Sequence, residues 1–377
     1  MKTLKETGIS PIFGKWTASR AQTKRMKTGR KVWMTLAIGL AVTTGLLAQD
    51  PHLSQFYAAP LEVNPALSGV FKGKFRINTN YRSQWGSITG TDAFRTLGLT
   101  YDMRFRGVGD GDFFSFNFHA IRDEAGAAKL SLTKGVIGMA YHKKMWDGRL
   151  GRTPQYLIVG GQAGFGQYAI NAGSLWFSSQ FNQSTGTVDP GLPTNEPWVT
   201  NAAPHFDFNV GGLWYSVLGE DFSIYAGAAL FHINQPNISF YDDRVPLYRK
   251  WTAYVGGQVP VTRELSILPS AMAAYQGPSF QTVFGSHIRY SNRDWWEIAI
   301  RAGLFARISN KLSNDIHNDA VIFNTTFEVE RWRFGVSYDM NVSSLQPSTN
   351  RRGAFELSGS YVHPLRAHRH AIECPKF

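Results

Sequence analysis

Apolar and polar residues alternate along most of the chain, in segments of about ten residues such as transmembrane β-strands use. Within residues 74–84, Phe75 and Ile77 fall on one face of an extended strand. Arg76 and Asn78 fall on the opposite face. A soluble β-sandwich rarely repeats such polar partners through strands of this length. A barrel with lipid outside and water inside explains both faces.

The pattern predicts a single all-β fold, an antiparallel transmembrane outer-membrane β-barrel of about 14 strands. The count is even, as closure of such barrels usually requires. The predicted strands cover residues 74–84, 93–105, 113–122, 133–145, 155–167, 206–216, 221–233, 250–262, 264–276, 280–291, 295–307, 320–330, 332–342 and 352–363.

The connections between these strands mostly alternate in length, as in barrels with short periplasmic turns and longer external loops. Glu330-Arg331 is a tight turn, whereas residues 168–205 and 343–351 are long connections. The long segment 146–154 and the short segment 277–279 depart from the alternation, and we expect a misplaced strand boundary there. We expect residues 168–205 to form an external loop that meets cargo or a surface partner, because unusually long loops tend to be functional.

The apolar run 32–48 follows a short basic stretch and ends in small residues. This order is typical of a secretory signal, so we predict a signal peptide over residues 26–49 and export to the outer membrane. Residues 1–25 lie upstream of an internal start at Met26 and are a candidate misannotated extension. A signal anchor holding a periplasmic domain is the alternative interpretation of the apolar run.

The formal charge of +12 is concentrated in the leader. Residues 1–49 hold nine Lys or Arg and one acid, a net charge of +8, which leaves +4 for the rest of the chain. No basic run remains after the leader, so the charge gives no support to nucleic-acid binding.

Two groups of residues offer metal-ligand chemistry, but neither has the spacing of a known site. We interpret the first group as a basic tail and the second as a solvated loop. The first group is His363, His368, His370 and Cys374, which is the only cysteine in the chain. The second group is Asp315, Asn318 and Asp319.

No motif for catalysis or cofactor binding is recognisable. The chain lacks a G-x-S-x-G elbow, a Gly-rich phosphate loop and a CxxC pair. The neighbouring carboxylates Glu328 and Glu330 share one predicted strand face, so we expect them to line the lumen. We therefore predict a protein that is not an enzyme, with no catalytic residues, no cofactor and no metal.

The segment of residues 50–72 is too polar and too rich in proline to be a strand that faces lipid. Pro51, Pro60 and Pro65 would each break a β-ladder. We expect this segment to lie in the lumen or in the periplasm. The barrel then covers residues 73–363, and residues 364–377 form a C-terminal tail.

Several local motifs resemble one family of outer-membrane proteins. Residues 50–57 read Asp-Pro-His-Leu-Ser-Gln-Phe-Tyr, residues 64–67 read Asn-Pro-Ala-Leu, and residues 81–85 read Tyr-Arg-Ser-Gln-Trp. Later matches include residues 335–339 and the closing Cys-Pro-Lys-Phe. The chain resembles the PorP/SprF family, which is associated with type IX secretion and gliding motility.

The resemblance implies a barrel that helps to export a secreted surface protein, such as an adhesin, or anchors it by binding its C-terminal sorting domain. It also implies periplasmic type IX components and outer-membrane lipid as partners, and no nucleic acid. A passive porin or hydrophobic-solute channel is the alternative, and an open rather than plugged lumen would favour it. The candidate partner-binding residues are Phe56, Tyr57, Asn64, Pro65, Leu67, Tyr81, Arg82, Gln84 and Trp85.

Overall fold

The computed structural model describes most of the chain after the leader. The predicted extension and signal peptide lie outside the described residues, and so does nearly all of the predicted tail, including His368, His370 and Cys374. The described residues are 50–105, 111–146, 153–196, 201–219, 221–241, 243–292, 298–310 and 315–364.

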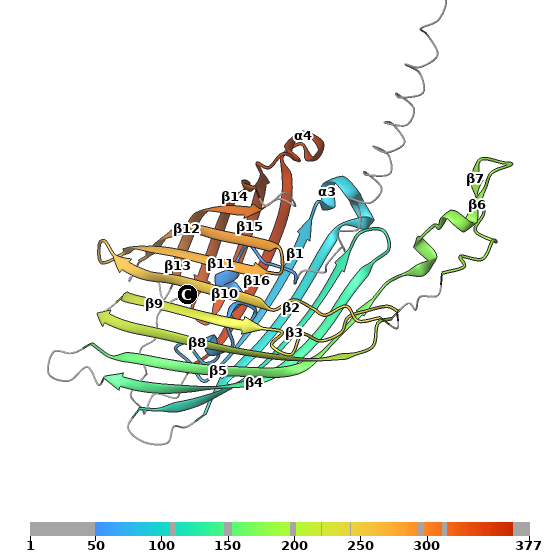
Figure 1. Ribbon diagram of the computed structural model, residues 1–377. Coiled ribbons are helices and arrows are strands. Elements are labelled where there is room, and N and C mark those ends of the chain that lie inside the picture. Colours follow the sequence, from blue (N-terminus) through green and yellow to red (C-terminus); the bar gives the residue numbers. More distant parts are fainter. Residues whose placement is uncertain are drawn as a thin grey trace, which may run out of the picture. The chain divides into compact units, whose positions relative to one another are not determined.

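Fourteen antiparallel strands form a closed barrel, in which β1 pairs with both β2 and β16 (Figure 1). This confirms the predicted fold class and strand number. The barrel strands are β1 (Phe75–Gln84), β2 (Phe94–Arg104), β3 (Phe113–Ala125), β4 (Leu130–Trp146), β5 (Gln155–Ala169), β8 (His205–Gly219), β9 (Phe222–Phe231), β10 (Lys250–Pro260), β11 (Leu265–Gln276), β12 (Ser279–Ser291), β13 (Ile298–Asn310), β14 (Ile316–Val329), β15 (Trp332–Asn341) and β16 (Arg352–His363).

The two ends of the barrel differ, and we call them the loop end and the turn end. The loop end carries the β1–β2, β5–β8 and β15–β16 connections, which hold the short helices and strands that lie outside both the barrel wall and the lumen (Figure 1). The turn end carries tight connections such as that between β14 and β15. The elements of the loop end are α3 (Gly86–Thr89), η3 (Gly90–Asp92), η5 (Ala172–Ser174), η6 (Ser178–Gln180), β6 (Phe181–Asn182), β7 (Thr187–Val188) and α4 (Gln346–Thr349).

Three local expectations about the strands are wrong. A strand boundary is not misplaced at residues 277–279, because β11 and β12 are joined there by a two-residue turn in which Gly277 has φ +56°. Asp319 lies in β14 rather than in a solvated loop, and its carboxylate pairs with Arg307 at 2.5 Å. Glu330 lies in the turn after β14, so it does not share a strand face with Glu328.

None of the helices in the described residues is long and apolar enough to cross a membrane.

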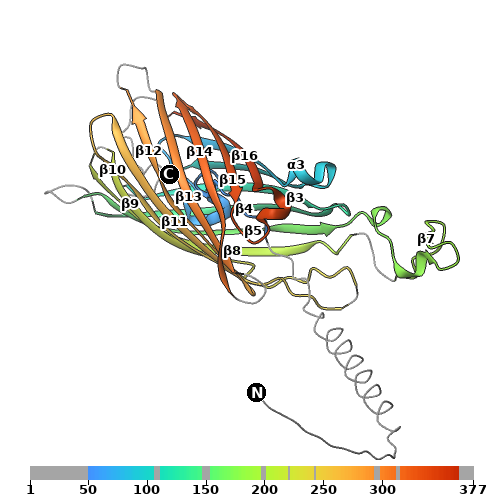
Figure 2. The same cartoon turned by 90° about the horizontal axis from the view of Figure 1, so that it is seen from above.

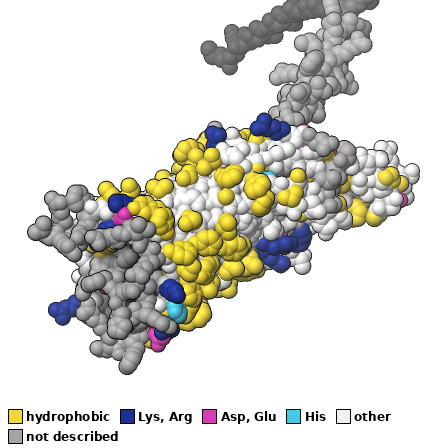
Figure 3. All heavy atoms as spheres, turned by 90° about the horizontal axis from the view of Figure 1, so that it is seen from below, with side chains coloured by type: hydrophobic (Ala, Val, Ile, Leu, Met, Phe, Trp, Pro, Cys, Tyr) yellow, Lys and Arg dark blue, Asp and Glu magenta, His cyan; other side chains and the backbone are white. Residues whose placement is uncertain are grey.

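The two faces of the wall follow the predicted alternation. The side chains of Leu97 and Phe334 are more than half exposed on the outside, whereas Arg76 and Arg301 are buried on the inside. Apolar side chains gather on the outer wall in Figure 3. The predicted orientation of these residues is confirmed, and the outer face has the composition that lipid requires.

Part of the lumen is also apolar, which simple alternation does not predict. On β5, Tyr156 and Ile158 are buried inside, although Leu157 and Val159 are exposed outside. The inward apolar residues form one cluster with the N-terminal segment, so this side of the lumen packs like the core of a soluble protein. The buried strand residues include Ile158, Leu213, Tyr215, Val283, Phe305 and Ile322.

The wall orientation makes Val336→Arg a severe substitution. Val336 is the fifth of ten residues in β15 and is 41% exposed on the outer face. A charge at this depth costs about 2–4 kcal/mol. We expect Val336→Arg to reduce the folded barrel measured by heat-modifiable migration in gels. Val336→Ala, which keeps the site uncharged, should assemble normally, and equal yields of the two variants would contradict this orientation.

Candidate functional site

The segment of residues 50–72, which we call the plug, lies inside the barrel (Figures 1 and 2). It folds into η1 (Phe56–Ala58), α2 (Pro60–Val63) and η2 (Pro65–Leu67). Pro60 and Pro65 each occupy the first helical position, where a missing N–H costs nothing. Asn64 caps η2, since its side chain accepts a hydrogen bond from the Ala66 N–H at 2.7 Å. The prolines that exclude a strand therefore start short helices.

The plug runs through the lumen from the loop end towards the turn end. At its start, the Asp50 N–H donates to Gln276 Oε1 at the last residue of β11, at 2.9 Å. Near its other end, the Gly69 N–H donates to Asp102 Oδ2 in β2 at 2.8 Å. The Lys74 N–H then donates to the last residue of β16, and β1 begins. The plug is thus anchored near both ends of the lumen.

Asp50 is buried among charged groups at the loop end. Its Oδ2 lies 2.9 Å from His232 Nε2 and 3.2 Å from Lys250 Nζ. The other ring nitrogen of His232 lies 2.8 Å from Asp207 Oδ1, so this imidazole bridges two carboxylates. Burial raises the pKa of the Asp50 carboxyl, but His232 and Lys250 outweigh it and hold the pKa well below its usual value. Asp50 is therefore ionised at neutral pH.

A second charged cluster holds the next residues of the plug. The Glu356 carboxylate accepts the Ser54 N–H at 2.7 Å and the Gln55 N–H at 2.9 Å. Arg82 pairs with Glu356 and with Asp339, and these side chains are at most 3% exposed. Glu356 thus satisfies the backbone of the plug, whereas Asp339 and Arg82 bind the Ser54 hydroxyl, which donates to Asp339 and accepts from Arg82.

The middle of the plug is fixed by Asn64. Its Nδ2 donates to the Gly212 carbonyl at 2.9 Å and to the Ala228 carbonyl at 3.0 Å. It also lies 3.2 Å from the Tyr254 hydroxyl. Asn64 therefore caps a helix with one end of its amide and binds the barrel wall with the other.

Two strand glycines make room for this contact. A Cβ on Gly160 would lie 2.7 Å from the Ala66 nitrogen, and one on Gly211 would lie 1.9 Å from Asn64 Oδ1. Real Cβ atoms do not approach other atoms so closely. These glycines therefore allow close backbone approach by the plug, which is one of the roles of glycine within a strand.

Aromatic residues of the plug pack against strands β12 and β13. The Phe56 and Phe305 rings meet edge to face at 6.1 Å, and the Tyr57 and His287 rings do so at 4.6 Å. Burial raises the pKa of the Tyr57 hydroxyl, so it stays protonated. Leu67 is buried in the same apolar cluster.

The structure brings most of the predicted partner-binding residues together but separates three of them. Tyr81 is 38% exposed on the outer wall. Trp85 follows β1 at the loop end with φ 58°, and its ring meets Phe94 edge to face at 5.3 Å. Gln84 accepts a hydrogen bond from Arg82 at the end of the same strand. The residues gathered in the lumen are Phe56, Tyr57, Asn64, Pro65, Leu67 and Arg82.

Sequence reasoning missed the strand carboxylates that hold the plug. Asp207, Asp339 and Glu356 are each at most 2% exposed on inward positions of strands. Charged groups are rarely buried without partners. In the sequence alone, inward carboxylates are equally compatible with a water-filled lumen, so they gave no signal that the lumen is filled.

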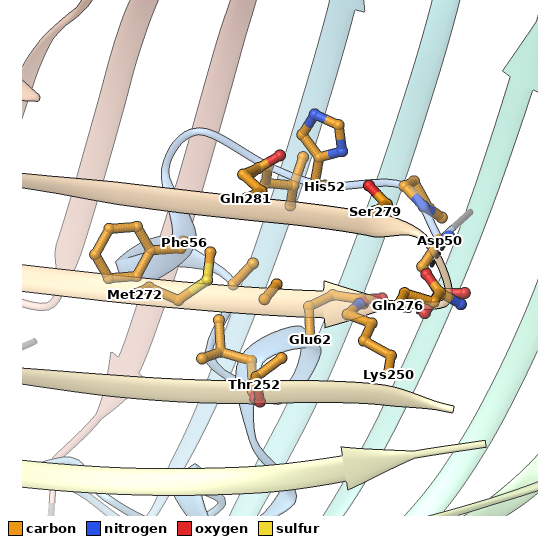
Figure 4. A pocket seen from close by; sticks show the side chains of 15 residues that line it. Asp50, His52, Phe56, Glu62, Lys250, Thr252, Met272, Gln276, Ser279 and Gln281 are labelled. Atoms are coloured by element: carbon orange, nitrogen blue, oxygen red, sulfur yellow. Dashed lines mark hydrogen bonds and ion pairs between the residues drawn. The ribbon is translucent and has the colours of Figure 1, made fainter. Parts of the chain in front are cut away.

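A cavity of about 70 Å³ lies between the plug and strands β10 to β12 (Figure 4). Phe56 and Met272 lie on its apolar side, and Asp50, Lys250 and Gln276 gather at its other end in Figure 4. Within the described part of the chain, no group of three or more His, Cys, Asp or Glu side chains is placed to hold a metal ion.

The lowered pKa of Glu62 predicts how pH affects the binding of the plug in the lumen. Glu62 Oε1 lies 2.9 Å from His119 Nε2. Burial raises the pKa of Glu62, but His119 and Lys134 outweigh it and lower the pKa from 4.5 to about 2. A lowered pKa gives stability that is full above pH 4.5 and is lost as pH falls towards 2. Protonation of Glu62 therefore removes part of the electrostatic attraction that holds the plug in the lumen.

We therefore expect channel openings of the barrel in a planar bilayer to become more frequent as pH falls from 4.5 to 2. The Glu62→Gln variant has no carboxylate to titrate, so its openings should change much less over this range. An equal pH dependence in both proteins would show that another group controls the plug.

Several solved structures of transporters and porins show weak similarity to this chain. The Pseudomonas putida toluene transporter TodX is 11% identical over 84% of this chain and 99% of its own, with a TM-score of 0.41. The Ralstonia pickettii toluene transporter TbuX is 9% identical over 80% and 91%, with a TM-score of 0.41. The KdgM porin is 10% identical over 76% and 98%, with a TM-score of 0.34.

Sequence comparison identifies the family. No curated protein sequence matches the chain. The profile of the type IX secretion system membrane proteins PorP/SprF matches residues 46–361, which is nearly all of the barrel and the plug. The resemblance seen in the local motifs is thereby confirmed. The chain belongs to the PorP/SprF family of type IX secretion system membrane proteins.

Proposed function

We propose that this protein is a non-enzymatic outer-membrane barrel that helps to export a secreted surface protein, or anchors it, by binding its C-terminal sorting domain. A signal peptide over residues 26–49 would deliver the barrel to the membrane. The observation that carries the proposal is the filled lumen, in which the plug is held by Asp50, Asn64 and the Glu356 cluster. A barrel whose interior is occupied by its own chain is suited to binding a partner.

The filled lumen argues against the passive porin. A porin needs a continuous aqueous path, and barrels of 16–18 strands provide one. Here the barrel is crossed by a segment whose Leu61 and Ala66 are fully buried. Burying those side chains stabilises the closed state by the hydrophobic effect, so opening carries a free-energy cost.

The β5–β8 connection is the surface that we assign to the secreted protein. It projects beyond the barrel at the loop end (Figures 1 and 2). Trp176 is 56% exposed there, and Phe181 is 49% exposed. Val188 and Leu192 add further exposed apolar surface. Exposed apolar side chains away from lipid favour contact with another protein.

The candidate partner-binding residues then divide into three groups. Phe56, Asn64 and Leu67 seat the plug, as do their neighbours Tyr57 and Pro65. Arg82 holds it through Glu356, and Gln84 supports Arg82. Trp85 lies at the loop end, where a secreted protein would arrive, and Tyr81 lies against lipid. Periplasmic type IX components would meet the turn end.

Copurification from native membranes tests the proposal. The tagged barrel should retain a secreted protein, identified by mass spectrometry, and deletion of that protein's C-terminal domain should abolish its retention. The double variant Trp176→Ser, Phe181→Ser should lose it too. The matched control Ser184→Ala, Thr185→Ala changes exposed polar residues of the same connection and should retain it.

Two results would contradict the proposal. One is retention of lipid alone by a folded barrel from cells that secrete type IX cargo. The other is steady conductance of small solutes by the intact barrel, which would favour the porin.

A further inference from the structure

A small cavity lies beneath the plug at the turn end of the lumen, and we call it the arginine pocket. Its volume is about 30 Å³, which is room for roughly two ordered waters or one small oxyanion. Tyr57 of the plug lines it on one side. Arg76, Arg301 and Arg333 line it from three different strands. Arg76 and Arg333 are each the second residue of a strand, so the pocket lies close to the turn-end opening.

Positive charge exceeds negative charge around this pocket. Arg289 and Arg301 both pair with the single carboxylate Glu328. Arg333 stands opposite Glu328 in the register of β14 and β15 and is half-buried. In the part of the chain that the structure describes, Arg333 makes neither a hydrogen bond nor an ion pair. Within the described residues, Arg333 therefore faces a carboxylate that already pairs with Arg289 and Arg301.

The fourth guanidinium does not reduce this excess. Arg76 is neutralised by its own partner, because its Nε and Nη2 bind the Asp102 carboxylate at 3.0 and 2.9 Å. Burying an unpaired cation costs free energy that a bound anion would recover. The pocket is thus electrostatically incomplete as it stands.

Hydroxyl groups with no partner also face this cavity. Thr326 lines it and is only 8% exposed. Within the described residues, Thr326 Oγ1, Ser360 Oγ and Tyr57 Oη are buried without a hydrogen-bond partner. A buried hydroxyl is nearly always satisfied in a folded protein. Three such groups beside an unpaired guanidinium indicate a missing acceptor.

We propose that the arginine pocket binds one oxyanion of the phosphate or carboxylate class. Guanidinium groups bind both with short, charge-assisted hydrogen bonds, and hydroxyl groups complete the shell of donors. Because Tyr57 and Ala58 line the pocket, a bound oxyanion also holds η1 of the plug in its seat. The anion reaches the site from the periplasmic side and is either free phosphate or a carboxylate supplied by a partner.

Anion-dependent stabilisation of the purified barrel tests this site. The apparent unfolding temperature, followed by tryptophan fluorescence, should rise saturably with inorganic phosphate relative to chloride at equal ionic strength. Arg333→Gln should abolish the rise. Arg331→Gln, an exposed arginine in the adjacent turn, makes the same charge change outside the pocket and should keep it. Thr326→Val should weaken apparent phosphate affinity roughly tenfold, because one hydrogen bond to the anion is lost.

Acetate in place of phosphate distinguishes the two sources. A rise with phosphate alone supports a free phosphate ligand, whereas a rise with acetate supports a carboxylate. If Arg333→Gln does not assemble, the comparison of wild type with Thr326→Val decides. No rise with either anion in the wild-type barrel would overturn the proposal. An equal rise in wild type, Arg333→Gln and Thr326→Val would also overturn it.

Discussion

Deletion of residues 52–67, with the signal sequence retained, is expected to leave a barrel in the outer membrane but to abolish surface display of its cargo. The wall should still form, because all fourteen strands pair with both neighbours through the backbone. The plug contacts would be lost, and lumen residues such as Ile158 and Leu213 would be exposed to water. The proposed role in display requires the filled lumen, so display should fail.

The deletion should also change conductance. The lumen of a barrel this wide is not filled by its own wall side chains, so removing the plug should open an aqueous path. Display is measured by labelling cargo on intact cells, and conductance is measured in planar bilayers. A barrel that conducts but no longer displays cargo is the expected result.

Replacing the segment by another sequence of equal length distinguishes the effect of losing the plug contacts from the effect of shortening the chain. Replacing residues 52–67 by a Gly/Ser sequence keeps the connection to β1 but removes anchors such as Asn64 and Phe56. This variant should also fail to display cargo. Normal display by either variant would refute the role given to the plug, and conductance gained with display intact would favour the porin.

Much of the wall could be predicted from the sequence because lipid imposes a simple rule on it. Strands such as β1 and β15 alternate cleanly, and both lie close to their predicted bounds. On β5 and β8 the rule is weaker, because Ile158 and Leu213 are apolar and yet face inward. These positions pack against the plug rather than against water, so both faces of the strand are apolar.

The position of the plug could not be fixed in the same way. Its prolines and polar residues exclude lipid, but they are compatible with either the lumen or the periplasm. The location of the plug in the lumen is determined by contacts between residues that are distant in sequence, such as Ser54 with Glu356 and Asn64 with Ala228. No local pattern encodes such pairs. The glycine pairs come closest to encoding such a contact. A glycine pair within a strand lowers the stability of the strand, so it indicates that another part of the chain must approach the backbone there.

The glycine pair of β5 therefore gives a sharp test of how the plug is seated. Gly160 faces the lumen, where a Cβ would lie 2.7 Å from the Ala66 nitrogen. Gly161 is the next residue and faces outward, and the closest atom to its Cβ would be a carbonyl oxygen at 3.7 Å. Gly160→Leu should force the Asn64–Ala66 turn away from the wall, whereas Gly161→Leu should add one more apolar side chain towards lipid.

The two variants are compared through a buried cysteine in the plug. Ala59 is 2% exposed, so Ala59→Cys in a Cys374→Ser background should react with maleimide only when the plug leaves its seat. Overpacking costs about 1–3 kcal/mol, which corresponds to roughly a 5- to 150-fold faster reaction in Gly160→Leu. Gly161→Leu should react at the wild-type rate. Similar rates in both variants would mean that the plug does not depend on the space at Gly160. The expected difference between two adjacent glycines follows only if the plug rests directly on the backbone of the barrel wall.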